Sequence, residues 1–250
     1  MKKISVVIIT FNEEQKIKRC IESVLSFADE IVVVDSFSTD QTVQICESLN
    51  ARVVQHPFGG YIEQKNYALH CATHDFVFSI DADEEVSGRL SQSINEIKQS
   101  GNAVAYAMNR LNIYCGKAIH NSGWYPDRKI RLFDRTKCKW GGINPHDKII
   151  IEGNAEAVQL KGDLIHYSYN TISEHIAQQN RFTDIAAKQL FDKGKTATVF
   201  DIYLRPLWKF FRDYFINRGF MDGYFGFVVC RISAHSVFLK YIKLKQLQNN

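Results

Sequence analysis

Acidic side chains follow several strongly apolar runs of the sequence. Asp35 follows I-V-V-V, Asp81 and Asp83 follow F-V-F-S-I, and Asn12 and Glu13 follow V-V-I-I-T-F. Residues two apart in an extended chain point to the same side, so Asp81 and Asp83 can act together. Two carboxylates beside a crevice suit Mg²⁺ or Mn²⁺, with a diphosphate completing the ligands. The alternative interpretation is a solvated acidic turn.

Alternating strands and helices are expected to bring these acids together. The β-branched and apolar runs that predict strands are residues 4–9, 31–34, 53–54 and 76–80. Between them, apolar residues at helical spacing predict helices, the first with Ile17, Cys20, Ile21, Val24 and Leu25 on its apolar face. This alternation predicts βαβ units in an α/β domain, with a mostly parallel twisted sheet and flanking helices. Ligands bind such sheets at the carboxyl ends of the strands, where the acids lie.

The pattern changes after about residue 100. Residues 103–110 and 130–134 predict strands, and residues 173–192 predict a long helix. Residues 201–245 predict further helices, broken near Gly219, Gly223 and Gly226. With 45% hydrophobic and 23% charged residues and only 4 prolines, the chain has a globular composition, which excludes disordered and collagen-like classes. We expect a catalytic domain over residues 1–195 and a helical C-terminal region over residues 196–250.

Four blocks of the first ninety residues carry a family resemblance. They are V-V-I-I-T-F-N-E-E, V-V-V-D-S-F-S-T-D, Q-K-N-Y-A-L and F-S-I-D-A-D-E-E. In this order and spacing they resemble a family 2 glycosyltransferase with the GT-A fold, which is Rossmann-like. The resemblance implies that the nucleotide-sugar donor is bound by Thr10, Phe11, Asn12, Glu13, Asp35, Lys65, Asn66 and Asp81. It also implies that Asp83 binds the metal directly. The alternative for Lys65 is a surface charge on a helix.

A second series resembles the lipopolysaccharide core glucosyltransferases within this family. It reads N-S-G-W-Y-P-D-R-K-I-R-L-F-D-R and then N-P-H-D-K, where the related series has Val-His-Glu. The resemblance implies an acceptor site formed by Trp124, Asp127, Arg131 and His146. Transfer with inversion needs one general base to deprotonate the acceptor hydroxyl, and Asp147 is the candidate. The alternative is an ion pair between Asp147 and Lys148 or Arg128.

His166, in L-I-H-Y-S-Y, is a candidate third metal ligand, because several GT-A enzymes use a late histidine in this way. The alternative is a structural histidine at a strand end. The six cysteines are widely spaced without a C-x-x-C pair, which favours reduced thiols. The apolar run at the N-terminus ends in Asn-Glu-Glu without a cleavage site, so it predicts a strand and not a signal peptide.

The last fifty residues differ from the rest of the chain. They contain eight Lys and Arg, three acids and twelve aromatic residues, whereas the whole chain is only +4. We expect no membrane span, because no run reaches about eighteen uncharged apolar residues. An interfacial helix on an anionic membrane, attached in part by charge and weakened by salt, fits this composition. Packing on the catalytic domain and a homodimer interface stay open, whereas no nucleic-acid fold pattern is present.

These observations favour an inverting glycosyltransferase that uses Mg²⁺ or Mn²⁺. The expected reaction moves a hexose, with glucose favoured, from a UDP-sugar to a hydroxyl of a glycolipid or saccharide such as the lipopolysaccharide core. The expected location is cytoplasmic, peripheral on the inner face of the cytoplasmic membrane. One alternative acceptor is polyprenyl phosphate, which is already ionised and needs no base. Another alternative is a non-catalytic scaffold that binds nucleotide or membrane.

Overall fold

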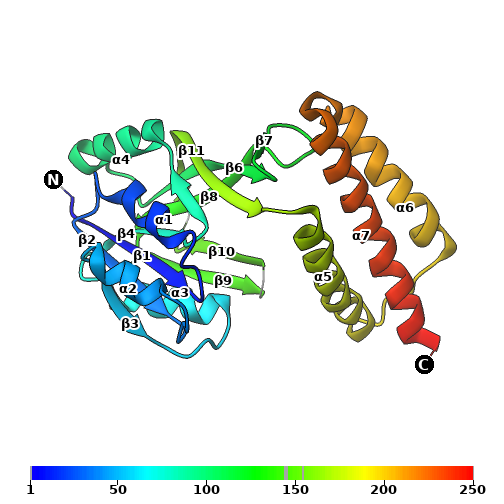
Figure 1. Cartoon of the computed structure of the whole chain (residues 1–250), viewed down its shortest axis with the longest axis horizontal. Coiled ribbons are helices and arrows are strands. Elements are labelled where there is room, and N and C mark those ends of the chain that lie inside the picture. The colour runs from blue at the N-terminus through cyan, green and yellow to red at the C-terminus, as the bar shows by residue number, and fades with distance from the viewer. Residues whose placement is uncertain (1, 144–145, 154, 250) are drawn as a thin grey trace. The chain divides into compact units, whose positions relative to one another are not determined.

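The computed structural model describes residues 2–143, 146–153 and 155–249, and of His146 only the backbone. The chain forms two compact units (Figure 1). The first unit is Met1–Arg110 with Asp127–His166, and the second is Leu111–Pro126 with Tyr167–Asn250. These two units do not follow the domain boundary expected after residue 195. The helix α5 (Ile172–Asp192), which precedes that boundary, packs on the C-terminal helix and belongs to the second unit. The extent of the catalytic domain stays a prediction.

A mixed sheet forms the centre of the first unit. Its order is β3 (Arg52–Gln55), β2 (Glu30–Asp35), β1 (Ile4–Thr10), β4 (Phe76–Asp81), β8 (Asp127–Asp134), β6 (Ala105–Tyr114), β11 (Val158–Tyr169) and β5 (Glu84–Val86). The first four strands are parallel. The pairs β4–β8, β6–β8 and β5–β11 are antiparallel. The predicted α/β fold is confirmed, and its four parallel strands come from the N-terminal part of the chain.

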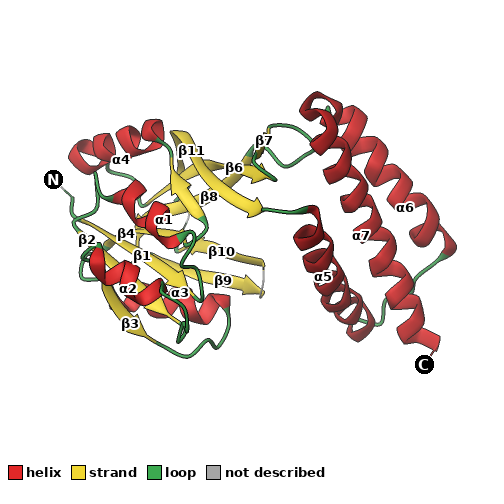
Figure 2. Ribbon diagram, in the orientation of Figure 1, coloured by secondary structure: helices red, strands yellow, loops and turns green. Residues whose placement is uncertain are grey.

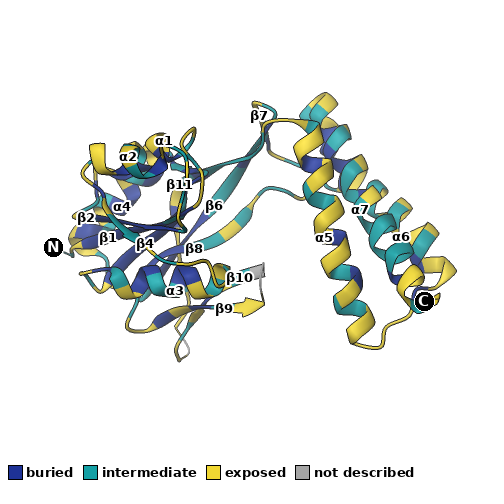
Figure 3. Cartoon of the chain, turned by 60° about the horizontal axis from the view of Figure 1, so that its bottom comes forward, coloured by how far each residue is buried: buried dark blue, intermediate teal, exposed yellow. Residues whose placement is uncertain are grey.

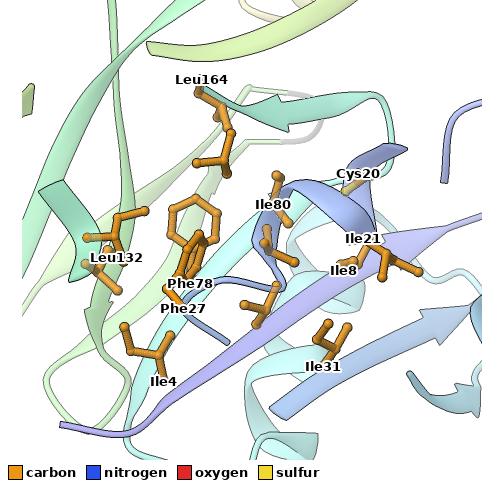
Figure 4. Close-up of a cluster of buried hydrophobic side chains, with 14 of the residues drawn as sticks. Ile4, Ile8, Cys20, Ile21, Phe27, Ile31, Phe78, Ile80, Leu132 and Leu164 are labelled. Atoms are coloured by element: carbon orange, nitrogen blue, oxygen red, sulfur yellow. The ribbon is translucent and has the colours of Figure 1, made fainter. Parts of the chain in front are cut away.

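Three helices cover one face of this sheet: α1 (Ile17–Val24), α2 (Thr42–Ser48) and α4 (Gly88–Ser100). Alternate residues of β1, among them Ile4 and Ile8, pack beneath them with Phe78 of β4 (Figure 4). This alternation is expected of a strand that is buried on both faces. Leu25 does not join this core as the periodicity predicts, because α1 ends at Val24 and leaves Leu25 51% exposed.

The opposite face carries α3 (Tyr61–Cys71) and a hairpin of β9 (Cys138–Ile143) and β10 (His146–Ile151). Val7 of β1 packs here with Ala68 and Leu69 of α3 and with Trp140 and Ile149 of the hairpin. The hairpin therefore lies against α3, which connects the parallel strands β3 and β4, although the two are far apart in the chain. This packing brings residues of the two halves of the sequence to the same part of the unit.

The second unit is mainly helical (Figure 2). It contains β7 (Lys117–Ile119), α5 (Ile172–Asp192), α6 (Val199–Phe211), a π-helical turn η1 (Arg212–Ile216), a 3₁₀ turn η2 (Gly219–Asp222) and α7 (Gly223–Asn249). The helices α5 and α6 both pack along α7. Their small core includes Ala187 of α5 and Leu244 of α7.

The break between α6 and α7 is narrower than the glycine pattern predicts. It comprises residues 217–218, where Arg218 has a left-handed φ of 56°, and η2 then leads into α7 at Gly223. Gly226 lies inside α7 and does not break it. A Cβ at Gly226 would lie 2.0 Å from the carbonyl oxygen of Gly219, so this close approach requires glycine.

The stretch Gly219–Asn249 corrects one expectation from the sequence. It is a helical segment of 31 residues that, by length and composition, could cross a membrane. The expectation of no such segment required an uncharged run, whereas this segment has the length and apolar composition of a span although it contains charged residues.

Candidate active site

The carboxyl ends of three neighbouring parallel strands bring the predicted donor residues together. Thr10, at the end of β1, lies opposite Asp35 at the end of β2. Ile9 lies opposite Asp81, at the end of β4. The prediction that these strand ends converge is thus confirmed by the register. Thr10 is 5% exposed, and its hydroxyl has no hydrogen-bond partner among the described residues.

Two cations hold Asp81 in place. Arg131 of β8 lies 2.7 Å from Asp81 Oδ2, and Lys65 of α3 lies 3.0 Å from Oδ1. Burial by itself raises the pKa of Asp81, but the charges of Arg131 and Lys65 outweigh it and hold that pKa well below its ordinary value. Asp81 is therefore ionised and firmly oriented at neutral pH.

Lys65 also reaches the candidate base. Its Nζ lies 2.8 Å from Asp147 Oδ2, and the side chains of Lys65 and Asp147 are only 6% and 15% exposed. Below the ammonium group is the ring of Trp140, 4.4 Å from Nζ to the centroid. Lys65 is therefore shared between Asp81 and Asp147, and it is not the surface charge of the alternative interpretation. The ion pair found for Asp147 is therefore with Lys65, and not with Lys148 or Arg128 as the alternative interpretation has it.

Residues beside Lys65 attach α3 to its surroundings. Asn66 Nδ2 donates to the carbonyl oxygen of Trp140, and Asn66 Oδ1 accepts from the Trp140 amide, each at 3.0 Å. Because Trp140 belongs to β9, these bonds hold the hairpin whose other strand carries Asp147. Gln64, which is fully buried, donates to Ser36 Oγ in the loop after β2 at 3.0 Å.

Asp83 and His166 form a second pair. His166 Nε2 lies 3.3 Å from Asp83 Oδ2, and the side chains are 19% and 29% exposed, respectively. Burial raises the pKa of Asp83, but the contact with His166 outweighs it and lowers the pKa overall. An ionised carboxylate beside an imidazole is a reasonable donor set for Mn²⁺ or Mg²⁺. Within the described ranges, no group of three or more His, Cys, Asp and Glu side chains could hold a metal ion. Asp83 and His166 therefore offer one oxygen and one nitrogen of the kinds that bind these ions.

The loops after β1 and β2 are tied to each other. Asn12 has a φ of 54°, its amide donates to Ser38 Oγ, and its Oδ1 accepts from the amide of Thr39, each bond at 2.8 Å. Asp35, fully buried, accepts from the amide and the hydroxyl of Ser38 at 2.9 and 2.5 Å. Both Asn12 and Asp35 therefore shape these loops.

The other donor-side residues of this region differ in exposure. The ring of Phe11 is 57% exposed and thus open to a ligand. Glu13 pairs with Lys16 at 3.1 Å, and burial raises its pKa.

The residues predicted to bind the acceptor are spread over both units. Arg131 is 3% exposed and pairs with Asp81 and Glu84, each at 2.7 Å. Asp127 pairs with Arg110 at 2.8 Å. Trp124 is part of the second unit, where its ring lies 5.9 Å from that of Tyr114. His146 begins β10, and its side chain is outside what the structure describes.

Sequence reasoning missed Glu84 and Trp140. Glu84 is 1% exposed, accepts from the Asp81 amide at 3.1 Å and pairs with Arg131. Its signal was available in D-A-D-E-E, where a third acid directly follows the pair. Trp140 supports Lys65 and accepts the Asn66 bond, but K-W-G-G by itself carries no signal for either contact.

Several known proteins are similar to this chain. The family model described as Glycosyl transferase family 2 matches residues 5–152. A Rickettsia typhi protein named uncharacterized glycosyltransferase RT0209 is 36% identical over 99% of this chain and 88% of its own length. The lipopolysaccharide core biosynthesis glycosyltransferase LpsC of Rhizobium meliloti is 31% identical over 97% of this chain and 92% of its own length.

Among solved structures, the chain is similar to glucosyl-3-phosphoglycerate synthase from Mycobacterium tuberculosis. With Mg²⁺ and UDP bound, that enzyme aligns at 21% identity and a TM-score of 0.40 over 54% of this chain and 57% of that one. Its complex with Mn²⁺ and UDP-glucose aligns at 26% identity and a TM-score of 0.37 over 44% of each chain. The alignments thus span about half of the synthase. The family match covers more than half of this chain, and two relatives exceed 30% identity over nearly all of it, so the chain belongs to glycosyl transferase family 2.

Proposed function

We propose that this glycosyltransferase is an inverting, metal-dependent enzyme that moves a hexose, with glucose favoured, from a UDP-sugar to a hydroxyl of a glycolipid acceptor. The observation that carries the proposal is the position of Lys65 between Asp81 and Asp147, at 3.0 and 2.8 Å. A cation beside the carboxyl ends of the strands suits a diphosphate, and a carboxylate beside it suits proton abstraction.

Asp147 is the proposed general base. Its carboxylate takes the proton of the acceptor hydroxyl while the hydroxyl oxygen attacks the anomeric carbon. The bond from that carbon to the diphosphate oxygen breaks, and the diphosphate leaves with the electron pair. Because attack occurs opposite the leaving group, the configuration at the anomeric carbon inverts.

Lys65 couples donor binding to this base. While its ammonium group pairs with Asp147, that carboxylate is engaged in the ion pair. A donor diphosphate would compete for the same ammonium group and so release Asp147. Lys65 would then stabilise the charge that develops on the leaving group.

Asp83 and His166 are the proposed protein ligands of Mg²⁺ or Mn²⁺. Their oxygen and nitrogen lie 3.3 Å apart, so both can face one ion, and Asp83 is held in its ionised form. A bound ion would supply Lewis-acid assistance to the departing diphosphate.

The remaining donor-site residues keep their proposed roles with one revision. Thr10, Phe11, Asn12, Glu13 and Asp35 form the proposed nucleotide side. Asn66 is better explained as a positioning residue, because both ends of its amide bond Trp140.

On the acceptor side, Arg131 likewise acts through Asp81, because it is buried and paired. Trp124, Asp127 and His146 stay proposed acceptor residues.

The lipopolysaccharide core is the proposed acceptor. The name of the Rhizobium meliloti relative, similar over 97% of this chain, supports this class of acceptor. A glycolipid acceptor lies at a membrane surface, so we place the enzyme in the cytoplasm, peripheral on the inner face of the cytoplasmic membrane.

A thermal-shift panel of nucleotide-sugars with and without Mn²⁺ tests the donor assignment. UDP-hexoses should raise the melting temperature, and more so with Mn²⁺, whereas GDP-, ADP- and CMP-sugars should have little effect. Product analysis then tests inversion, since an α-linked donor should give a β-linked product. The proposal would be contradicted if only nucleotide-sugars other than UDP-sugars raised the melting temperature, or if the product kept the configuration of the donor.

A further inference from the structure

The polarity of α6 is reversed relative to an ordinary surface helix. One apolar stripe follows the helix at spacings of three and four residues, and each member is between 48 and 64% exposed: Phe200, Tyr203, Leu204, Leu207, Trp208 and Phe211. Phe215 and Ile216 continue it through η1, at 51 and 55% exposed. A helix on a water-exposed surface normally turns its apolar stripe inward. Figure 3 shows exposed positions along α6.

The acids of this segment point the other way. Asp201 and Asp213 are 8% and 1% exposed. Asp201 pairs with Arg205, and Asp213 pairs with Lys209 at 2.6 Å and with Arg212 at 3.1 Å. The carboxylates therefore face the interior of the second unit and bind the nearby cations, and the apolar side chains face outward. An exposed apolar surface of this extent on one face marks an interaction site.

We propose that α6 and η1 lie in the plane of a lipid bilayer, with the apolar stripe inserted at the boundary between headgroups and acyl chains. The five charged residues of the segment exclude a crossing by α6 itself, because charges are costly in the hydrocarbon core. They suit an interfacial helix, in which cations lie at headgroup level and aromatic rings such as Tyr203 and Trp208 at the interface.

Charge favours lipid over a second copy of this chain. Residues 201–250 contain eight Lys and Arg against three acids, so an excess of five positive charges is left even after the acids are paired, and a second copy would not complement it. An anionic lipid surface carries the complementary sign. The apolar stripe therefore fits an anionic bilayer better than the same stripe of a second copy of the chain.

This mode of attachment differs from the salt-weakened one that the sequence composition suggests. Lys209 and Arg212, which composition alone marks as free charges, share the buried Asp213. Their pairing leaves less charge to attract lipid, so insertion of the stripe should dominate. Membrane binding should accordingly resist salt, because salt screens charge but does not weaken apolar burial.

Flotation of the full-length protein with vesicles tests the inference. The vesicles contain equal parts of phosphatidylethanolamine and phosphatidylglycerol, in about 0.1 M and about 1 M NaCl. We expect the wild type to float at both salt concentrations, with less than about a threefold difference in affinity. Leu207→Glu should weaken binding about tenfold or more, because it places a charge in the inserted stripe.

Ile185→Glu is the matched control. Ile185 is an aliphatic residue of α5 that is 45% exposed and outside the stripe, so this variant should float like the wild type. Trp208 offers an independent readout. Its fluorescence should shift to the blue on addition of vesicles, and Trp208→Phe should abolish that shift while the protein still floats.

Several outcomes would overturn the inference. They are failure of the wild type to float, release at high salt, equal loss in Leu207→Glu and Ile185→Glu, and a dimer in solution that Leu207→Glu dissociates without any vesicle binding. Full flotation of Leu207→Glu would also contradict it and would point to α7. The reason why the enzyme would bind a membrane rests on the proposed glycolipid acceptor. The flotation test itself needs no donor or acceptor. UDP binding should be unchanged in Leu207→Glu, so failure of the membrane surface and failure of the proposed reaction are separable.

Discussion

Lys65 Nζ lies 2.8 Å from Asp147 Oδ2, and this contact joins two residues that are 82 positions apart in the chain. Lys65 comes from α3, which connects the parallel strands β3 and β4, and Asp147 comes from the hairpin on the same face of the sheet. The pair therefore connects the proposed donor side of the site with the proposed base.

The first prediction concerns UDP binding. Lys65→Met should weaken it by about 1 to 3 kcal/mol, because a charge-assisted contact to the diphosphate is lost. Asp147→Asn should leave UDP affinity equal or higher, since Lys65 then has one competitor fewer. Calorimetry measures both, with Asp127→Asn as a carboxylate control. A loss of UDP affinity in Asp147→Asn as large as in Lys65→Met would rule out the shared lysine.

The second prediction concerns the metal. Asp83→Ala should abolish transfer. It should leave the fold intact, because the Asp83 side chain is 29% exposed and the ion pair found for it is with His166. It should also abolish UDP-dependent Mn²⁺ binding, measured by electron paramagnetic resonance. Glu85→Ala, which removes a neighbouring carboxylate paired with Arg19 at 3.5 Å, is the matched control. Wild-type turnover of Asp83→Ala in EDTA-treated buffer would show the metal role to be wrong.

Asp35 gives the third prediction. Asp35→Asn should weaken UDP binding by about 1 to 3 kcal/mol if the carboxylate contacts the donor. Because Asp35 is buried and accepts two bonds from Ser38, it should also lower stability. Ser38→Ala separates the effects, since it removes the hydroxyl bond and leaves the carboxylate. Equal losses of UDP affinity in the two variants would assign Asp35 to loop structure only.

The fourth prediction is a pH dependence of stability. His175 is 1% exposed, stacks on Tyr169, and burial lowers its pKa from 6.5 to about 4. The folded second unit therefore contains a neutral imidazole at neutral pH. The contribution of His175 to the free energy of unfolding is lost as the pH falls from 6.5 toward 4. Linkage gives a loss of about 2 kcal/mol between about pH 7 and about pH 5.

Chemical denaturation at both pH values measures the His175 effect. His175→Gln, which keeps a partner for the Tyr114 hydroxyl at 3.1 Å but cannot titrate, should flatten the dependence. An unchanged slope in that variant would assign the pH dependence to another group.

The parallel half of the fold could be predicted because its signals are local. Buried parallel strands are continuous β-branched runs, as in I-V-V-V, and the helices between them follow a period of 3.6. The strand ends then fix which acids converge, and Thr10, Asp35 and Asp81 lie where the order of strands implies.

The antiparallel half and the pairing within the site could not be predicted in the same way. The strands β5 and β7 have three residues each, and such short segments have no periodicity. The bonds of Asn66 to Trp140 join residues 74 positions apart, which no local pattern encodes. The inverted polarity of α6 was also hidden, because periodicity shows that a helix has an apolar stripe but not which way the stripe faces.

Transfer by Asp147→Asn tests the central proposal most directly. The measurement is the rate of hexose transfer from a saturating UDP-sugar to a purified lipopolysaccharide-core acceptor, with donor binding checked in the same preparation. We predict that Asp147→Asn binds the donor as the wild type does and transfers about 10²- to 10⁴-fold more slowly, because the acceptor hydroxyl has lost its general base. Transfer at a near-wild-type rate would contradict this account, and would instead favour an acceptor that is already ionised, such as a polyprenyl phosphate.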